Sequence, residues 1–198
     1  MKSQKNLPHP RKPSATYPEA YALLWVSRRD EKRLADFFTS WGISPAAIQR
    51  GMHLTVYYAR RILPDLCPGG LSRKVEIKVD VSETRFMVLA PGGENPRPDL
   101  DPSRRSLGIR LTKRNKAISQ IQELRTEMRR FETPAIVGGP KPSTWWSSSF
   151  GARGYQPHIK LLRPGSEVDS DLTKLGEAFR EAFTTIDFRK FTIKERSR

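Results

Sequence analysis

Hydrophobic positions recur along the chain in two rhythms, which predict strands alternating with helices. Short apolar runs, or apolar residues that alternate with polar ones, predict strands at 21–26, 52–58, 75–81, 85–90, 107–111, 157–162 and 186–193. Apolar residues at three- and four-residue spacing predict amphipathic helices at 34–41, 115–131 and 172–183. Segments rich in Pro, Gly and Ser, at 91–102 and 133–154, predict long surface loops. The pattern therefore indicates a mixed α/β (α+β) fold.

The order of these elements suggests two related halves, each with strands and helices, although we find no strict internal sequence repeat. We expect residues 17–198 to form a single bilobal domain. Residues 1–16 combine several prolines with basic side chains and carry too few apolar groups for a core. We therefore expect this segment to be a flexible basic tail.

The charge of the chain changes the functional picture more than its length does. The formal net charge of the 198 residues is +15, spread along the whole sequence, which indicates a phosphate-bearing partner such as RNA or a nucleotide. Cys67 is the only cysteine, so an internal disulfide is excluded and a reducing cytoplasmic location fits best. No apolar run is long enough to span a membrane. We expect a protein that is not embedded in a membrane and that acts as a monomer.

Two histidines stand in matching contexts on predicted strands. His53-Leu-Thr-Val and His158-Ile-Lys-Leu each read histidine, apolar, polar, apolar. Because side chains alternate along a strand, His53 and Thr55 share one face, and so do His158 and Lys160. The third histidine, His9, lies in the basic tail. A single strand histidine is as often a packed structural residue as a catalytic one, so the matched pair is the informative observation.

The four residues His53, Thr55, His158 and Lys160 suit phosphodiester hydrolysis without a metal. That reaction needs a base, an acid and donors to the charged phosphoryl oxygens, and two imidazoles with a hydroxyl and an ammonium supply them. A zinc site needs at least three converging ligands. Two histidines and the lone Cys67 would need additional carboxylates, and no motif in the sequence indicates which these would be. We expect no metal and no cofactor.

With these motifs, the chain resembles the 2H phosphoesterase superfamily, the group that includes RNA ligase-like cyclic phosphodiesterases. The hallmark of that superfamily is a pair of His-x-Thr/Ser-x motifs with apolar flanks. His53 to Val56 matches the first motif, whereas Lys160 stands where the second motif usually has Thr or Ser. The resemblance covers roughly residues 20–195 in the order of elements.

The resemblance implies a particular architecture and activity. It implies two pseudo-symmetric lobes, each a small, mostly antiparallel sheet with helices outside, and the two histidine motifs facing each other across a central cleft. It also implies metal-independent cleavage of 2′,3′-cyclic phosphates, 2′-5′ linkages or cyclic nucleotides. Lys160 departs from the motif, and a fixed cation there can still stabilise phosphoryl charge.

Aromatic and basic residues near the two motifs are candidates for binding the rest of a substrate. An exposed aromatic ring can stack on a nucleobase, and Trp145, Trp146 and Tyr155 precede the second motif, while Tyr57 follows the first. Arg153 lies between glycines and is a candidate phosphate contact. Core packing is the competing interpretation for Tyr57 and for at least one of the tryptophans.

Two other functions remain open at this stage. A non-catalytic or weakly active RNA- or nucleotide-binding protein would use the same basic surface, and Lys160 together with the net charge favours that alternative. A phage-type anti-CBASS nuclease, which degrades cyclic oligonucleotide signals, resembles the same superfamily. Turnover of a panel of cyclic nucleotides separates an enzyme from a binding protein.

Overall fold

The structure, a computed structural model, describes residues 19–59, 71–91, 95–129, 156–166 and 171–196. The strands and helices that the hydrophobic pattern predicts are present in these ranges. In chain order they are β1 (Glu19–Val26), α1 (Arg28–Ser40), β2 (His53–Ala59), β3 (Ser72–Asp80), β4 (Thr84–Leu89), the short 3₁₀ helix η2 (Pro102–Arg104), β5 (Ser106–Leu111), α2 (Ala117–Arg129), β6 (His158–Lys160), α3 (Leu172–Ala182) and β7 (Thr185–Arg196).

The seven strands form one antiparallel sheet in the order β3-β7-β1-β2-β6-β5-β4. The mixed α+β class is therefore confirmed. The sheet is continuous, because β2 and β6 pair directly and join the strands β3-β7-β1-β2 to the strands β6-β5-β4. The expected pair of separate small sheets is corrected in this respect: backbone pairing at the centre merges them into one.

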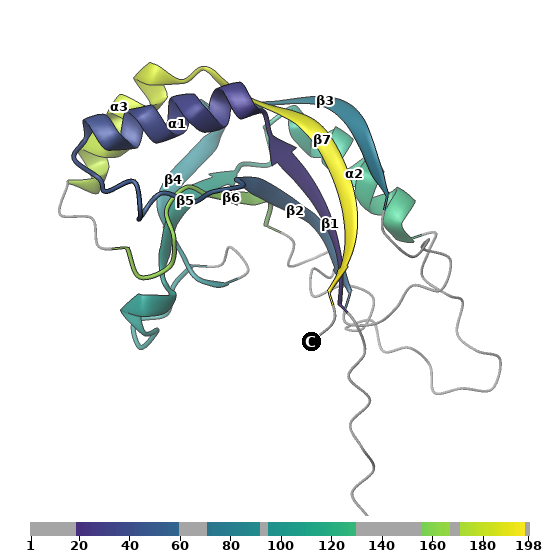
Figure 1. The fold of residues 1–198 in the computed structure, drawn as a ribbon, viewed down its shortest axis with the longest axis horizontal. Coiled ribbons are helices and arrows are strands. Elements are labelled where there is room, and N and C mark those ends of the chain that lie inside the picture. The colour runs from purple at the N-terminus through teal and green to yellow at the C-terminus, as the bar shows by residue number, and fades with distance from the viewer. Residues whose placement is uncertain (1–18, 60–70, 92–94, 130–155, 167–170, 197–198) are drawn as a thin grey trace, which may run out of the picture.

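The helices pack against one face of this sheet. Figure 1 shows the sheet curving like an arch, with α1 and α3 above the β4-β5-β6 side and α2 beside β3 and β7. One apolar cluster fills the space between them, and its most buried members include Leu34, Phe38, Ile121, Met128, Leu175 and Phe179 from the helices and Leu24, Leu54, Ile109 and Ile159 from the strands. Alternation along the strands then directs the intervening side chains to the other face.

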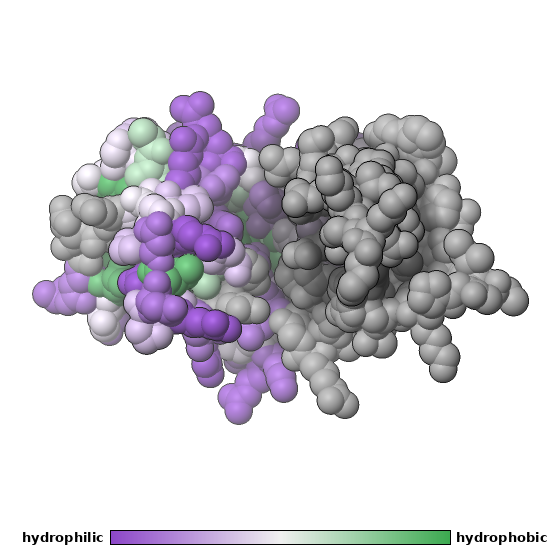
Figure 2. All heavy atoms as spheres, turned by 90° about the horizontal axis from the view of Figure 1, so that it is seen from below, coloured by the Kyte–Doolittle hydropathy of each residue, from purple (hydrophilic) through white to green (hydrophobic). Residues whose placement is uncertain are grey.

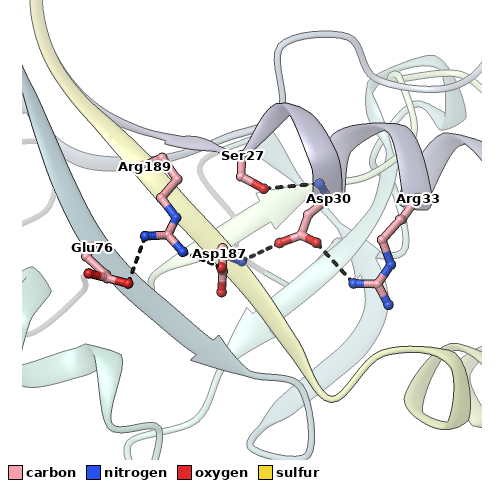
Figure 3. A network of polar contacts seen from close by, with 6 residues as sticks. All are labelled: Ser27, Asp30, Arg33, Glu76, Asp187 and Arg189. Carbon is pink, nitrogen blue, oxygen red and sulfur yellow. Dashed lines mark hydrogen bonds and ion pairs between the residues drawn. The ribbon is translucent and has the colours of Figure 1, made fainter.

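Helix α1 is fixed to the sheet by a buried carboxylate. The hydroxyl of Ser27 accepts a hydrogen bond from the Asp30 amide and caps the helix, as the position demands. The Asp30 side chain, only 7% exposed, accepts the backbone N–H of Asp187 in β7 at 2.8 Å and pairs with Arg33 at 3.1 Å. Arg189 extends the network by bridging Asp187 and Glu76 (Figure 3). The Asp30 contact ties the start of α1 to β7, and Arg189 ties β7 to β3.

Two features singled out in the sequence lie outside the described residues. The predicted basic tail, residues 1–16, lies outside them, and so does Cys67. Among the helices that are described, none has both the length and the apolar character needed to cross a bilayer.

Candidate functional site

The two histidine-bearing strands are direct neighbours at the centre of the sheet. Leu54 of β2 pairs with Ile159 of β6, and both side chains are buried in the core. In an antiparallel pair this register places residue 53 beside 160 and residue 55 beside 158. His53, Thr55, His158 and Lys160 therefore project from the same face, opposite the helices, which we call the histidine face.

The four predicted catalytic residues are thus brought together from distant parts of the chain. His53 and His158 are diagonal neighbours, for which Cβ atoms lie about 7 Å apart, a spacing that can hold one phosphate group between two side chains. The motifs lie side by side on adjoining strands, which corrects the expectation that they face each other from separate sheets. Figure 2 views the molecule from below Figure 1, on the side away from α1 and α3, and shows hydrophilic side chains over much of the described part of this side.

Both imidazoles are held by the same kind of hydrogen bond. Nδ1 of His53 lies 2.8 Å from the carbonyl oxygen of Gly51, and Nδ1 of His158 lies 2.9 Å from that of Gln156. A carbonyl oxygen can only accept, so each Nδ1 carries the proton and donates it. In the neutral ring, Nε2 is then the basic nitrogen. The carbonyl two residues before each histidine therefore selects the same tautomer twice.

The turn before His53 is itself anchored from α1. The carboxylate of Glu31 accepts the backbone N–H of Gly51 at 2.5 Å and that of Met52 at 3.4 Å. Gly51 has φ = 62°, a conformation that residues with a Cβ rarely adopt, and an added Cβ would lie 3.2 Å from the Trp25 ring. Glu31 and Gly51 thus orient the carbonyl that holds His53.

Burial and neighbouring cations keep both histidines neutral. Burial lowers the pKa of His53, opposed by its hydrogen bond to Gly51, and the charges of Lys160 and Lys194 lower it further. Burial likewise lowers the pKa of His158 to about 4, opposed by the bond to Gln156, with Lys160, Arg110 and His53 adding to the decrease. Burial also lowers the pKa of Lys160. The pair therefore lies in a site that disfavours extra positive charge, and the neighbouring cations favour an anion there.

A glycine gives β6 its place beside β5. Gly108 pairs with Lys160, and a Cβ added to it would collide with the carbonyl oxygen of Ile159 and lie 2.6 Å from Cδ1 of Leu89. No other residue type leaves room for the β6 backbone at this point. The position of the second motif therefore depends on a residue in a strand that carries none of the predicted site residues.

Trp25 belongs to the site although the sequence did not single it out. It pairs with His53 across β1 and β2, and the two ring centroids lie 5.2 Å apart. Its indole N–H donates to the hydroxyl of Thr192 at 2.7 Å, and Nζ of Lys194 lies 4.9 Å from its ring centroid. The apolar run at 21–26 shows no alternation of apolar and polar residues, so the sequence does not reveal that Trp25 lies on the histidine face.

Tyr57, a candidate for substrate binding, does not share the face of His53, although strict alternation along the strand would place it there. Leu23 pairs with Thr55 but Ala22 pairs with Tyr57, so Val56 is an extra residue that forms a β-bulge. The bulge turns Tyr57 into the core, where it is only 1% exposed. Tyr58 pairs instead with Tyr21, and their ring centroids are 4.8 Å apart. Tyr57 is therefore a core residue that a substrate cannot contact.

Four predicted substrate-binding residues, Trp145, Trp146, Arg153 and Tyr155, lie outside the described residues. Within the described ranges, no group of three or more His, Cys, Asp or Glu side chains could hold a metal ion. Arg110, which pairs with His158 across β5 and β6, is a further basic neighbour that the sequence analysis did not identify.

Comparison with known proteins adds no relative to this description. No protein-family model matches the chain, and no curated protein matches it.

Proposed function

We propose that the protein is a metal-independent phosphodiesterase of the two-histidine type, acting on 2′,3′-cyclic phosphate, 2′-5′ linked or cyclic (oligo)nucleotide substrates. One observation carries the proposal. His53 and His158 lie on adjoining central strands, point to one face, and each give the Nδ1 proton to the carbonyl two residues earlier. Two imidazoles on one face, each with Nε2 as its basic nitrogen, can supply the paired acid and base that the reaction requires.

The proposed reaction uses the four residues of the histidine face. Nε2 of one histidine removes a proton from water as the water oxygen attacks phosphorus. The protonated Nε2 of the other histidine donates its proton to the departing ribose oxygen. In a 2′,3′-cyclic phosphate this opens the cyclic phosphodiester to a phosphomonoester. Nζ of Lys160 and the hydroxyl of Thr55 donate to the non-bridging oxygens, whose charge grows in the transition state. The sum is the addition of one water across one P–O bond.

The electrostatics of the site support a role for the substrate's own charge. In the free protein the pKa values of both histidines are lowered, for His158 to about 4. The form in which both histidines are neutral therefore dominates at pH 7. A phosphate placed between them favours the protonated form of either ring, because opposite charges attract. We therefore infer that binding of the substrate anion raises the pKa of the histidines, so that one of them takes up the proton that it later donates.

The finer architecture that the superfamily resemblance implies is part of the same proposal. The paired strands β2 and β6 would mark the axis between two pseudo-symmetric lobes, and the histidine face would line the substrate cleft. The matching hydrogen bonds of His53 and His158 support this arrangement. We also propose that the protein acts in the cytoplasm.

A nucleotide panel with product analysis tests the activity. The wild-type protein should open nucleoside 2′,3′-cyclic phosphates or cleave 2′-5′ linkages in excess EDTA, and His53→Ala and His158→Ala should each slow turnover by about 10²- to 10⁴-fold. His9→Ala, in the predicted tail, is the matched control and should leave the rate unchanged. Loss of turnover on chelation, restored by a divalent ion, would contradict the metal-independent mechanism.

A non-catalytic RNA-binding protein is the second candidate. The neutral state of both histidines and the presence of Lys160 in the second motif favour it. This alternative holds if the wild-type protein turns over no member of the panel, yet binds RNA with an affinity that His53→Ala and His158→Ala do not change.

A further inference from the structure

A second basic feature lies beside the histidine face. A groove of about 1460 Å³ runs between the start of β4, the end of β5 and helix α2. Among the described residues its lining includes five cations, Arg85, Arg110, Lys113, Arg114 and Arg125, and one carboxylate, Glu83. That carboxylate already accepts the hydroxyl of Thr112 at 2.8 Å. Arg125, only 6% exposed, donates to the Val56 carbonyl at 2.7 Å, and Arg110 donates to the Asn95 side chain at 2.9 Å. The groove therefore carries an excess of positive charge, most of it exposed at Arg85, Lys113 and Arg114.

Two of these cations continue a row that begins at the histidines. Arg85 pairs with Arg110 across β4 and β5, and Arg110 pairs with His158 across β5 and β6. Neighbouring strands are about 4.8 Å apart, so the backbones of Arg110 and Arg85 lie about 5 and 10 Å from that of His158. Like charges directly opposite each other destabilise a sheet, and an anion lying over them relieves that repulsion.

The groove also reaches the second motif along the backbone. Gln156 and Pro157, the two residues before His158, line it. The carbonyl of Gln156 holds the His158 ring, while its side-chain oxygen is buried with no hydrogen-bond partner among the described residues. A ligand donor such as a ribose hydroxyl would satisfy that acceptor, because buried polar atoms are normally paired. The groove and the catalytic pair therefore share one wall.

We propose that this groove binds the phosphodiester backbone of an oligonucleotide whose terminal or scissile phosphate lies between His53 and His158. The proposal rests on the proposed function and identifies its substrate as an oligonucleotide. Small-ligand pockets occupy roughly 300 to 1000 Å³, so a groove of about 1460 Å³ exceeds the needs of a mononucleotide. Its exposed cations, Arg85, Lys113 and Arg114, match successive phosphates of a single strand. The acceptor of Gln156 matches the hydroxyl that distinguishes RNA.

The test compares two charge-neutralising double variants. Arg85→Gln/Arg114→Gln removes two cations from the groove without touching the four residues of the proposed catalytic set. Arg28→Gln/Arg29→Gln removes the same charge from exposed positions on α1 and is the matched control. The probes are a fluorescein-labelled oligouridylate of about ten nucleotides with a 2′,3′-cyclic phosphate end, and uridine 2′,3′-cyclic phosphate alone.

The groove variant should bind the oligouridylate about tenfold more weakly at physiological salt, with a salt slope smaller by about 1.4, as the loss of two phosphate contacts on a single strand requires. It should lower kcat/KM for the oligouridylate and leave that for the mononucleotide unchanged. The control should change neither by more than about twofold. Equal losses in both double variants, or parallel losses with both substrates, would overturn the proposal.

Anisotropy in the His53→Ala background separates this inference from the proposed activity, because binding in the groove does not need turnover. If no substrate is turned over but the groove variant alone weakens binding, the phosphodiesterase fails and the groove stands. If turnover is normal and the groove variant binds like the control, the groove fails and the phosphodiesterase stands.

Discussion

The charge of Lys160 should set the pH dependence of the reaction. Lys160 lowers the pKa of both histidines, whereas Lys194 acts on His53 and Arg110 on His158. Replacing Lys160 with Thr gives the second motif the hydroxyl that the first motif has in Thr55, and removes this charge. Both histidine pKa values should rise, so the whole profile of kcat/KM against pH should move to higher pH.

The magnitudes follow from the burial of the site. With a pKa of about 4, His158 is protonated in about one molecule in a thousand at pH 7, against about one in four for a solvated histidine of pKa 6.5. One pKa unit is 1.36 kcal/mol, so protonating the buried ring costs about 3 kcal/mol more than protonating a solvated one. The Lys160 charge, two residues from His158 along the same strand and so about 6.6 Å away, contributes about 1 kcal/mol at an effective dielectric near 50. That is about fivefold in protonated fraction.

The assay is kcat/KM of a nucleoside 2′,3′-cyclic phosphate from pH 4 to pH 9. The wild-type profile should be bell-shaped with its optimum below pH 6.5, because the active form has one neutral and one protonated histidine and both pKa values are lowered. The kcat profile should lie at higher pH, since bound phosphate raises both pKa values.

Two variants give the comparison its resolving power. Lys160→Thr should lose about 10²- to 10³-fold in rate as a weaker donor, yet its normalised kcat/KM on the alkaline limb should be about fivefold higher than that of the wild type. Lys194→Thr should move only the limb that belongs to His53, which assigns the two apparent pKa values. A Lys160→Thr profile that superimposes on the wild-type profile, or a wild-type optimum above pH 7, would refute the reasoning.

Three further predictions concern stability. The free energy of unfolding should fall by about 3 kcal/mol through His158 as pH drops from 7 to 4. The reason is that the unfolded chain binds the proton near pH 6.5, whereas the folded chain binds it only near the lowered pKa of about 4. Urea titrations should show a shallower fall in His158→Gln. Gly108→Ala should cost about 1 to 3 kcal/mol and lower kcat, since its Cβ meets the Ile159 carbonyl, and an unchanged urea midpoint would contradict this. Asp30→Ala should cost about 2 kcal/mol by leaving the backbone N–H of Asp187 unpaired. Its control, Asp36→Ala at an exposed ion pair, should cost under about 0.5 kcal/mol. Equal thermal shifts in the two variants would argue against Asp30 as an anchor of α1.

Local patterning determined the elements and the orientation within each motif. The alternation of His53, Leu54 and Thr55 predicts which side chains share a face, because a strand has a period of two wherever its pairing is regular. The helical stripes at 34–41 and 172–183 predict α1 and α3 for the same local reason, since residues three and four apart lie on one side of a helix. These features depend on neighbours within a few residues, which the sequence displays directly.

Tertiary structure alone decided which strands meet and what surrounds the histidines. The pairing of β2 with β6 joins segments far apart in the sequence, and no local pattern specifies such a contact. The bulge at Val56 turns Tyr57 into the core because pairing with β1 skips one residue, a register that depends on the partner strand. The pKa of His158 falls because folding removes water from the ring and brings Lys160 and Arg110 to it. Desolvation and long-range register arise only when distant segments pack, so the sequence named the two histidines while the fold decided their neighbours and their charge.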